Sequence, residues 1–127
     1  AEERGRALAE ACFTKGYIDT HPEAIPAMIE ARRQRPIDPV ALGHRMKAAH
    51  AHDTYDRLPQ ITAPTLVITG KDDVLISWEN SRTLADRIPG AKSVLLEPAG
   101  HIFWVEQKEK SLNEILTFLR IYETHKT

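Results

Sequence analysis

Two turns in the sequence carry side chains that together could move a proton during catalysis. Asp73 ends the segment Gly-Lys-Asp-Asp, which follows the apolar run 65–69, and His101 follows Gly100, just beyond the apolar run 92–97. A carboxylate that accepts the Nδ1 proton of a histidine fixes the tautomer and stabilises the imidazolium, so that Nε2 can take a proton from a nucleophile. The two residues therefore match the acid and the base of a catalytic triad.

The pattern around these turns predicts elements that would bring the two side chains together. The apolar runs at 65–69 and 92–97 predict two strands, each buried on both faces. The segments 77–90 and 108–123 predict two helices. The closing helix has one broad apolar stripe, made of Leu112, Ile115, Leu116, Leu119 and Tyr122. The order strand, helix, strand, helix predicts a parallel βαβ unit with a further helix on the sheet. Because parallel strands end at the same edge, we expect Asp73 and His101 to lie within hydrogen-bond distance.

The first part of the chain has the pattern of a helical lid. Three helices are predicted, at 1–12, 21–34 and 38–52. The third begins with Asp38 as N-cap and Pro39 at the first helical position. Its apolar residues Leu42, Met46 and Ala49 form only a narrow stripe. Such a helix is suited to lying over another surface rather than to building a core.

With these motifs in this order, residues 53–122 resemble the C-terminal part of an α/β-hydrolase. This family includes lactonases, carbon–carbon bond hydrolases, esterases and cofactor-free haloperoxidases. The resemblance implies that Asp73, in a Gly-x-x-Asp turn that starts at Gly70, is the triad acid. It also implies that His101, in a Gly-His pair after the last strand, is the base.

The resemblance also implies a domain organisation. Residues 1–52 resemble the cap helices that the family inserts before these strands. The implied fold is a partial α/β-hydrolase fold, with an N-terminal helical cap segment at 1–58 and a parallel β-α-β-α core at 59–127. No cofactor is implied.

The nucleophile expected from this resemblance is absent from the sequence. In the family it occupies a Gly-x-Ser-x-Gly elbow upstream of the cap. No serine has a glycine two residues before it, and the serines are Ser77, Ser81, Ser93 and Ser111. Cys12 also lacks the flanking glycines. Part of the oxyanion hole belongs to the same elbow. The resemblance therefore implies the C-terminal portion of a longer hydrolase, inactive alone.

Several candidate residues have more than one interpretation. Asp72 competes with Asp73 as the acid, since both lie in the same turn. Aromatic residues near the strand ends could either line a substrate pocket or simply pack, and they are Trp78, Phe103 and Trp104. A metal site was considered at His44, His50, His52 and Asp53. We expect no metal, because histidines two apart on a helix point in different directions.

Composition limits the partners and the compartment. The chain has 127 residues, 42% hydrophobic and 28% charged, as expected of one ordinary soluble domain. Its net charge of -1 gives no field to hold nucleic acid or an anionic membrane. No apolar run approaches the roughly 18 residues of a membrane span. The single Cys12 fits a reducing compartment, so the cytoplasm is expected.

Two classes of function remain open from the sequence. In the first, the chain is part of a hydrolase that cleaves a small ester, lactone, or activated carbon–carbon or carbon–halogen bond. In the second, it is a non-catalytic binding or assembly module. In the family the strand at 65–69 pairs with a strand that this sequence does not contain. We therefore expect a homodimer, or pairing with a missing N-terminal half.

Overall fold

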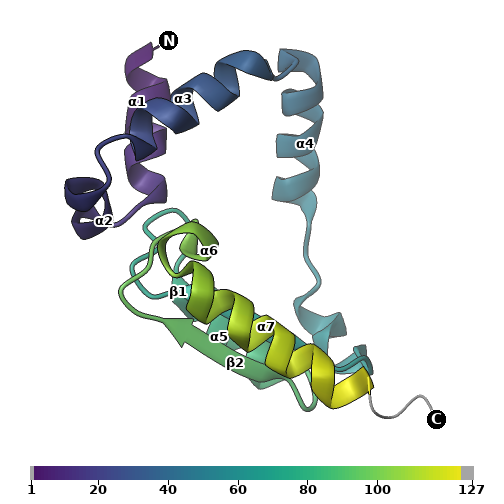
Figure 1. Ribbon diagram of the computed structural model, residues 1–127. Coiled ribbons are helices and arrows are strands. Elements are labelled where there is room, and N and C mark those ends of the chain that lie inside the picture. The colour runs from purple at the N-terminus through teal and green to yellow at the C-terminus, as the bar shows by residue number, and fades with distance from the viewer. Residues whose placement is uncertain (1, 124–127) are drawn as a thin grey trace.

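The computed structural model describes residues 2–123, and these form a helical segment followed by a small α/β unit (Figure 1). The helical segment contains α1 (Glu2–Cys12), α2 (Lys15–Thr20), α3 (Ala24–Gln34) and α4 (Pro39–Ala51). The α/β unit contains the 3₁₀ helix η1 (Tyr55–Gln60), β1 (Leu66–Gly70), α5 (Trp78–Arg87), β2 (Lys92–Leu96), α6 (Phe103–Glu106) and α7 (Lys108–Glu123). The predicted cap begins at residue 1 and the predicted core ends at residue 127. Residue 1 and residues 124–127 lie outside the described part.

The two strands form a parallel pair, as their sequence order predicts. Leu66 pairs with Lys92, and the register continues to Gly70 opposite Leu96. Helix α5 packs on both strands and α7 packs on β1. Figure 1 shows α7 lying across the sheet, with the two strand ends facing α1 and α2. The turns that follow both strands therefore lie at one edge, beside the helical segment.

The strands are less buried than their apolar sequences predict. In β1, Val67 and Gly70 are buried and the remaining residues are partly exposed. In β2 only Leu96 is fully buried, while Leu95 is 38% exposed. The prediction of strands buried on both faces is therefore wrong for β2. The physical reason is that the sheet has only two strands within residues 2–123, so few neighbours cover its faces.

Helix α7 does not bury the face that its leucines predict. Leu112, Leu116 and Leu119 are 51%, 40% and 50% exposed. Ser111 is buried instead, and Ile115 and Phe118 are partly buried. The helix is apolar over a wider arc than one contact can cover, so its hydrophobic pattern does not select the face that meets the sheet.

The first three helices form their own core around α1 and α3. Ala9, Cys12, Phe13 and Ile25 are its buried residues, and Ile102 from the α/β unit packs against them. Helix α2 is not predicted from the sequence. It begins because the side chain of Thr14 accepts a hydrogen bond from the backbone N–H of Tyr17, a local N-cap. The predicted second helix begins later than 21, as α3, after a turn at Pro22.

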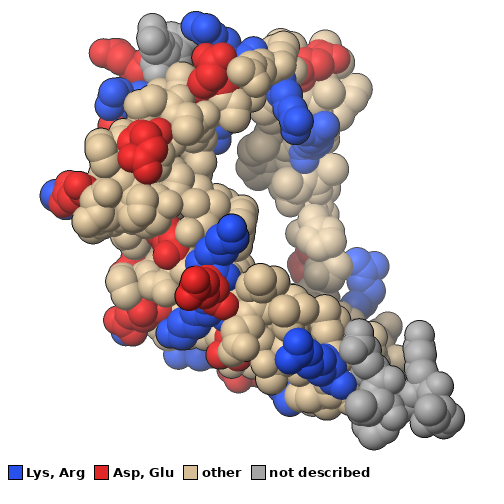
Figure 2. All heavy atoms as spheres, viewed as in Figure 1, with Lys and Arg blue, Asp and Glu red and all other residues tan. Residues whose placement is uncertain are grey.

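Helix α4 stands apart from the rest of the described chain. It begins as predicted, with Asp38 accepting a hydrogen bond from the Val40 N–H at 2.8 Å and with Pro39 in its first turn. Leu42 and Met46 are exposed rather than laid on another surface. Figure 2 shows the open gap between α4 and the other elements.

No helix within residues 2–123 is long and apolar enough to cross a membrane.

Candidate active site

The turns after β1 and β2 are tied directly to each other. The backbone N–H of Lys71 donates to the Leu96 carbonyl, and the N–H of Asp72 donates to the Ala99 carbonyl, both at 2.9 Å. At Gly70 a side chain would collide with the backbone carbonyls of Ala99 and Gly100. Glycine is required here because the second turn crosses immediately above the end of β1.

Replacing Gly70 by Ala is expected to lower the free energy of unfolding by about 1–3 kcal/mol, because the added methyl group must push the backbone of the second turn away. Urea denaturation followed by circular dichroism measures this change. Gly43→Ala is the matched control, since nothing lies within 4 Å of its position inside α4 and alanine favours a helix. Equal stability of the two variants would contradict the predicted collision.

Asp73 and His101 are neighbours at this edge. The Nδ1 atom of His101 lies 2.9 Å from Oδ2 of Asp73. The other carboxylate oxygen, Oδ1, accepts the backbone N–H groups of Leu75 and Ile76, both at 2.9 Å. The Asp73 side chain is 7% exposed and that of His101 is 33% exposed. A rigid, enclosed carboxylate thus holds one nitrogen of an imidazole that remains accessible.

The surroundings of Asp73 keep it ionised. Burial alone would raise the pKa of this carboxyl group, but hydrogen bonds from Ile76, His101 and Leu75 together lower it below its ordinary value. A lowered pKa means that the charged form stabilises the fold above about pH 3.9. That stabilisation is lost as the pH falls through the lower folded-state value. At neutral pH Asp73 is therefore an acceptor for the Nδ1 proton of His101.

Asp72, the competing acid, has a different contact. Its Oδ2 accepts the backbone N–H of Ala99 at 3.2 Å. It therefore links the two turns and does not contact His101. The neighbouring carboxylates of one turn have separate roles, which the sequence alone leaves open.

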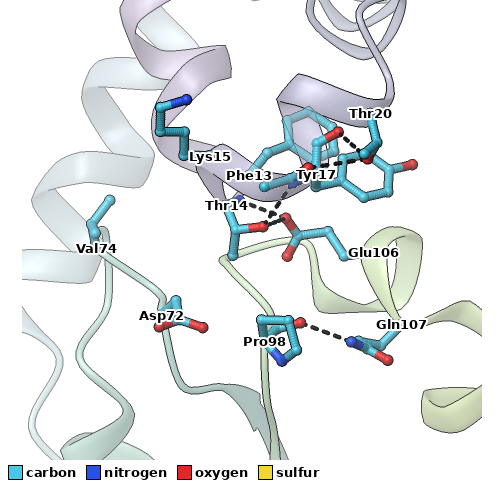
Figure 3. A pocket seen from close by; sticks show the side chains of 11 residues that line it. Phe13, Thr14, Lys15, Tyr17, Thr20, Asp72, Val74, Pro98, Glu106 and Gln107 are labelled. Atoms are coloured by element: carbon cyan, nitrogen blue, oxygen red, sulfur yellow. Dashed lines mark hydrogen bonds between the residues drawn. The ribbon is translucent and has the colours of Figure 1, made fainter.

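A cavity of about 540 Å³ lies between α2 and the two turns (Figure 3). Residues from both parts of the chain line it: Phe13, Thr14, Lys15, Gly16, Tyr17, Thr20, Asp72, Val74, Pro98, Glu106 and Gln107. Neither Asp73 nor His101 is among them, so the cavity lies beside the pair rather than over it.

Comparison with known proteins identifies the family. Residues 29–111, well over half of the chain, match the serine hydrolase (FSH1) family. This chain belongs to that family. Its fold is part of an α/β-hydrolase fold, since solved α/β-hydrolases superpose on nearly its whole length.

Relatives of this chain have several named activities. The RutD protein of Stutzerimonas stutzeri, to which carbamate hydrolysis is provisionally ascribed, is 43% identical over 75 residues, covering 59% of this chain and 28% of that protein. The enol-lactonase of Burkholderia xenovorans superposes with a TM-score of 0.83 at 26% identity, covering 94% of this chain and 45% of that one. A thermophilic esterase of Thermogutta terrifontis superposes with a TM-score of 0.79 at 28% identity, covering 93% and 43%. The chain spans less than half the length of each.

Cys12 lies close to the pair, but its chemistry does not suit a nucleophile. Burial raises the pKa of the Cys12 thiol, the charge of Asp73 raises it further, and Arg32 opposes both only in part. The thiolate is the reactive form of cysteine, and a raised pKa makes it scarce at neutral pH. Cys12 is best described as a core residue of the helical segment.

The predicted substrate-binding aromatics lie on two different helices. Trp78 begins α5, where the Arg82 guanidinium lies 5.5 Å from its ring centroid. Phe103 and Trp104 are in α6 and contact each other edge to face, with centroids 5.1 Å apart. None of the three lines the cavity between α2 and the two turns. Their role in substrate binding stays a prediction.

The histidines considered for a metal site lie at the far end of the helical segment. His50 Nδ1 lies 2.7 Å from the Met46 carbonyl oxygen within α4, while His52 caps the end of that helix. Across residues 2–123, no three or more His, Cys, Asp or Glu side chains are grouped so that they could hold a metal ion.

Sequence reasoning missed Glu106 and Thr14. The Glu106 carboxylate accepts hydrogen bonds from Thr14 and from the N–H of Gly100, the residue before His101. The available signal was an acidic residue five positions after a Gly-His turn. This signal could not identify Thr14 as the partner of Glu106, because the two residues are 92 positions apart in the sequence.

Proposed function

We propose that this chain carries the acid and base of a serine hydrolase triad, with Asp73 orienting His101 and His101 acting as the general base. The observation that supports this proposal is the 2.9 Å contact between His101 Nδ1 and Asp73 Oδ2 on an ionised, backbone-anchored carboxylate. The same pair occurs at the ends of two adjacent parallel strands, where α/β folds place reacting groups.

In the proposed mechanism, Asp73 holds the Nδ1 proton of His101, and Nε2 takes the proton of a nucleophilic hydroxyl group. The nucleophile then attacks the substrate, and the imidazolium, stabilised by Asp73, returns the proton to the leaving group. The sequence of 127 residues contains no Gly-x-Ser-x-Gly motif. We therefore place the nucleophile and its oxyanion hole on a segment outside this chain.

The proposed substrate is a small molecule with an ester, a lactone, or an activated carbon–carbon or carbon–halogen bond. Relatives named as an enol-lactonase and an esterase favour acyl substrates within this range. Residues 1–58 are proposed as the lid over the site, and residues 59–127 as part of the catalytic core. Contacts between α1, α2 and the His101 turn support this assignment.

A second function is that of a non-catalytic binding or assembly module on a hydrolase scaffold. The observation that favours it is the absence of the nucleophile elbow from the sequence. The two functions differ in whether a segment with that elbow restores activity to the chain.

The isolated chain is expected to give no burst with p-nitrophenyl acetate, because it lacks a nucleophile that could form an acyl-enzyme. Only slow imidazole-catalysed hydrolysis should remain, and stopped-flow absorbance measures both phases. His101→Ala and the exposed His44→Ala are compared as a matched pair. A burst, or turnover that survives His101→Ala, would place the chemistry elsewhere in the chain.

A further inference from the structure

The Glu106 carboxylate lies between the two parts of the chain and accepts hydrogen bonds from both. Its Oε1 accepts the backbone N–H of Thr14 at 2.5 Å and the Thr14 hydroxyl at 2.9 Å. Its Oε2 accepts the backbone N–H of Gly100. Figure 3 shows the Glu106 side chain pointing from the end of α6 toward Thr14. One side chain thus joins the helical segment to the turn that carries His101.

The backbone on both sides of His101 is held against the junction of α1 and α2. Gly100 is held through Glu106, and the N–H of Ile102 donates directly to the Cys12 carbonyl at 3.2 Å. The fit is tight at Gly100, where an added Cβ would lie 3.0 Å from the Cys12 carbonyl oxygen and could be accommodated only by a small shift of that backbone. His101 is therefore the central residue of a three-residue stretch fixed at each end to the helical segment.

The junction suits a side chain with two acceptor oxygens at position 106. All three partners of Glu106 are donors, and a carboxylate has only acceptors. A glutamine would present an NH₂ group to one of these donors, leaving that donor unpaired in a partly buried site. The isosteric change Glu106→Gln therefore breaks the link without removing volume.

We propose that Glu106 is a positioning residue that ties the backbone of His101, and through it the imidazole ring, to the position of the helical segment. The proposal rests on the proposed function of Asp73 and His101. The Nδ1–Oδ2 contact is 2.9 Å, so a displacement of about 1 Å in the 100–102 turn removes it from hydrogen-bond range. His101 is then aligned with Asp73 only while the α1–α2 junction is packed against the 100–102 turn.

Amide hydrogen exchange and imidazole NMR on the 127-residue chain test this link. In Glu106→Gln we expect amide exchange to become at least about tenfold faster at Gly100 or at Thr14, whichever then faces the NH₂ group of the glutamine, since that amide loses its acceptor. We also expect the downfield Nδ1 proton signal of His101 to weaken or vanish. The amides of β1 and β2 should keep their protection within about twofold. Glu109→Gln, an exposed change of the same kind three residues later, should behave as wild type.

Thr14→Ala provides a second variant, which leaves both amide contacts with Glu106 and removes the hydroxyl that donates to Glu106 and also caps α2. It should give a smaller change at the same positions. If Glu106→Gln resembles Glu109→Gln at His101, or at both Gly100 and Thr14, the proposal is wrong. A uniform loss of protection over all amides would also overturn it, because Glu106 would then stabilise the fold generally. If wild type lacks the Nδ1 proton signal while Gly100 or Thr14 responds to Glu106→Gln, the link is upheld and the proposed function fails.

Discussion

Replacing Asp73 by Asn in the assembled enzyme is expected to lower kcat about ten-thousand-fold, because the amide presents the wrong group to Nδ1 and no longer stabilises the imidazolium. Under the proposed function, the assembled enzyme is this chain together with a segment that supplies the nucleophile. The effect is expected on kcat rather than on KM, since the charge on His101 develops only during reaction.

Asp72→Asn is the matched control for this experiment. Asp72 is adjacent, but its carboxylate accepts the Ala99 N–H, which an amide oxygen can also accept. Its activity should stay within about tenfold of wild type. If Asp72→Asn causes the larger loss, Asp72 is the triad acid. If both variants keep full turnover, the pair takes no part in catalysis and the module function is favoured.

The isolated chain is expected to form a dimer at micromolar concentration. Within residues 2–123 no strand pairs with the second edge of β1, and open strand edges tend to find a partner. A two-stranded sheet is marginal alone, and the exposed leucines of α7 and the exposed Leu42 and Met46 of α4 add apolar surface. We expect the dimer to bury more than roughly 1,000 Å², the size of a specific interface. Light scattering behind a sizing column measures its mass.

Two double variants identify the surface that is buried in the dimer. Leu42→Gln with Met46→Gln alters only α4, and Leu112→Gln with Leu116→Gln alters only the exposed stripe of α7; both pairs keep good helix formers. Loss of the dimer in one pair assigns the interface to that helix. A dimer that survives both points to the β1 edge. A monomer with a cooperative melt independent of concentration would rule out self-association.

The local chemistry of the sequence was sufficient to predict several elements. Asp38 before Pro39 predicts the start of α4, and the short apolar runs predict β1 and β2 as a parallel pair. Each of these features depends on residues a few positions apart or on the alternation of strand and helix. Parallel strands end at one edge, so the contact between Asp73 and His101 also follows from the sequence order.

Tertiary structure alone decided which groups lie around that contact. Asp72 and Asp73 have the same chemistry in the same turn, and only the path of the second turn directs one to Ala99 and the other to His101. The face that α7 buries depends on what surrounds it, because its apolar arc is wider than one contact. The link from Glu106 to Thr14 joins residues 92 positions apart, a distance over which hydrophobic periodicity and capping preferences carry no information. The sequence by itself thus determined the two strands, most of the helices and the approach of an acidic turn to His101, whereas the choice between Asp72 and Asp73 and the packing of the helical segment on the His101 turn required the folded chain.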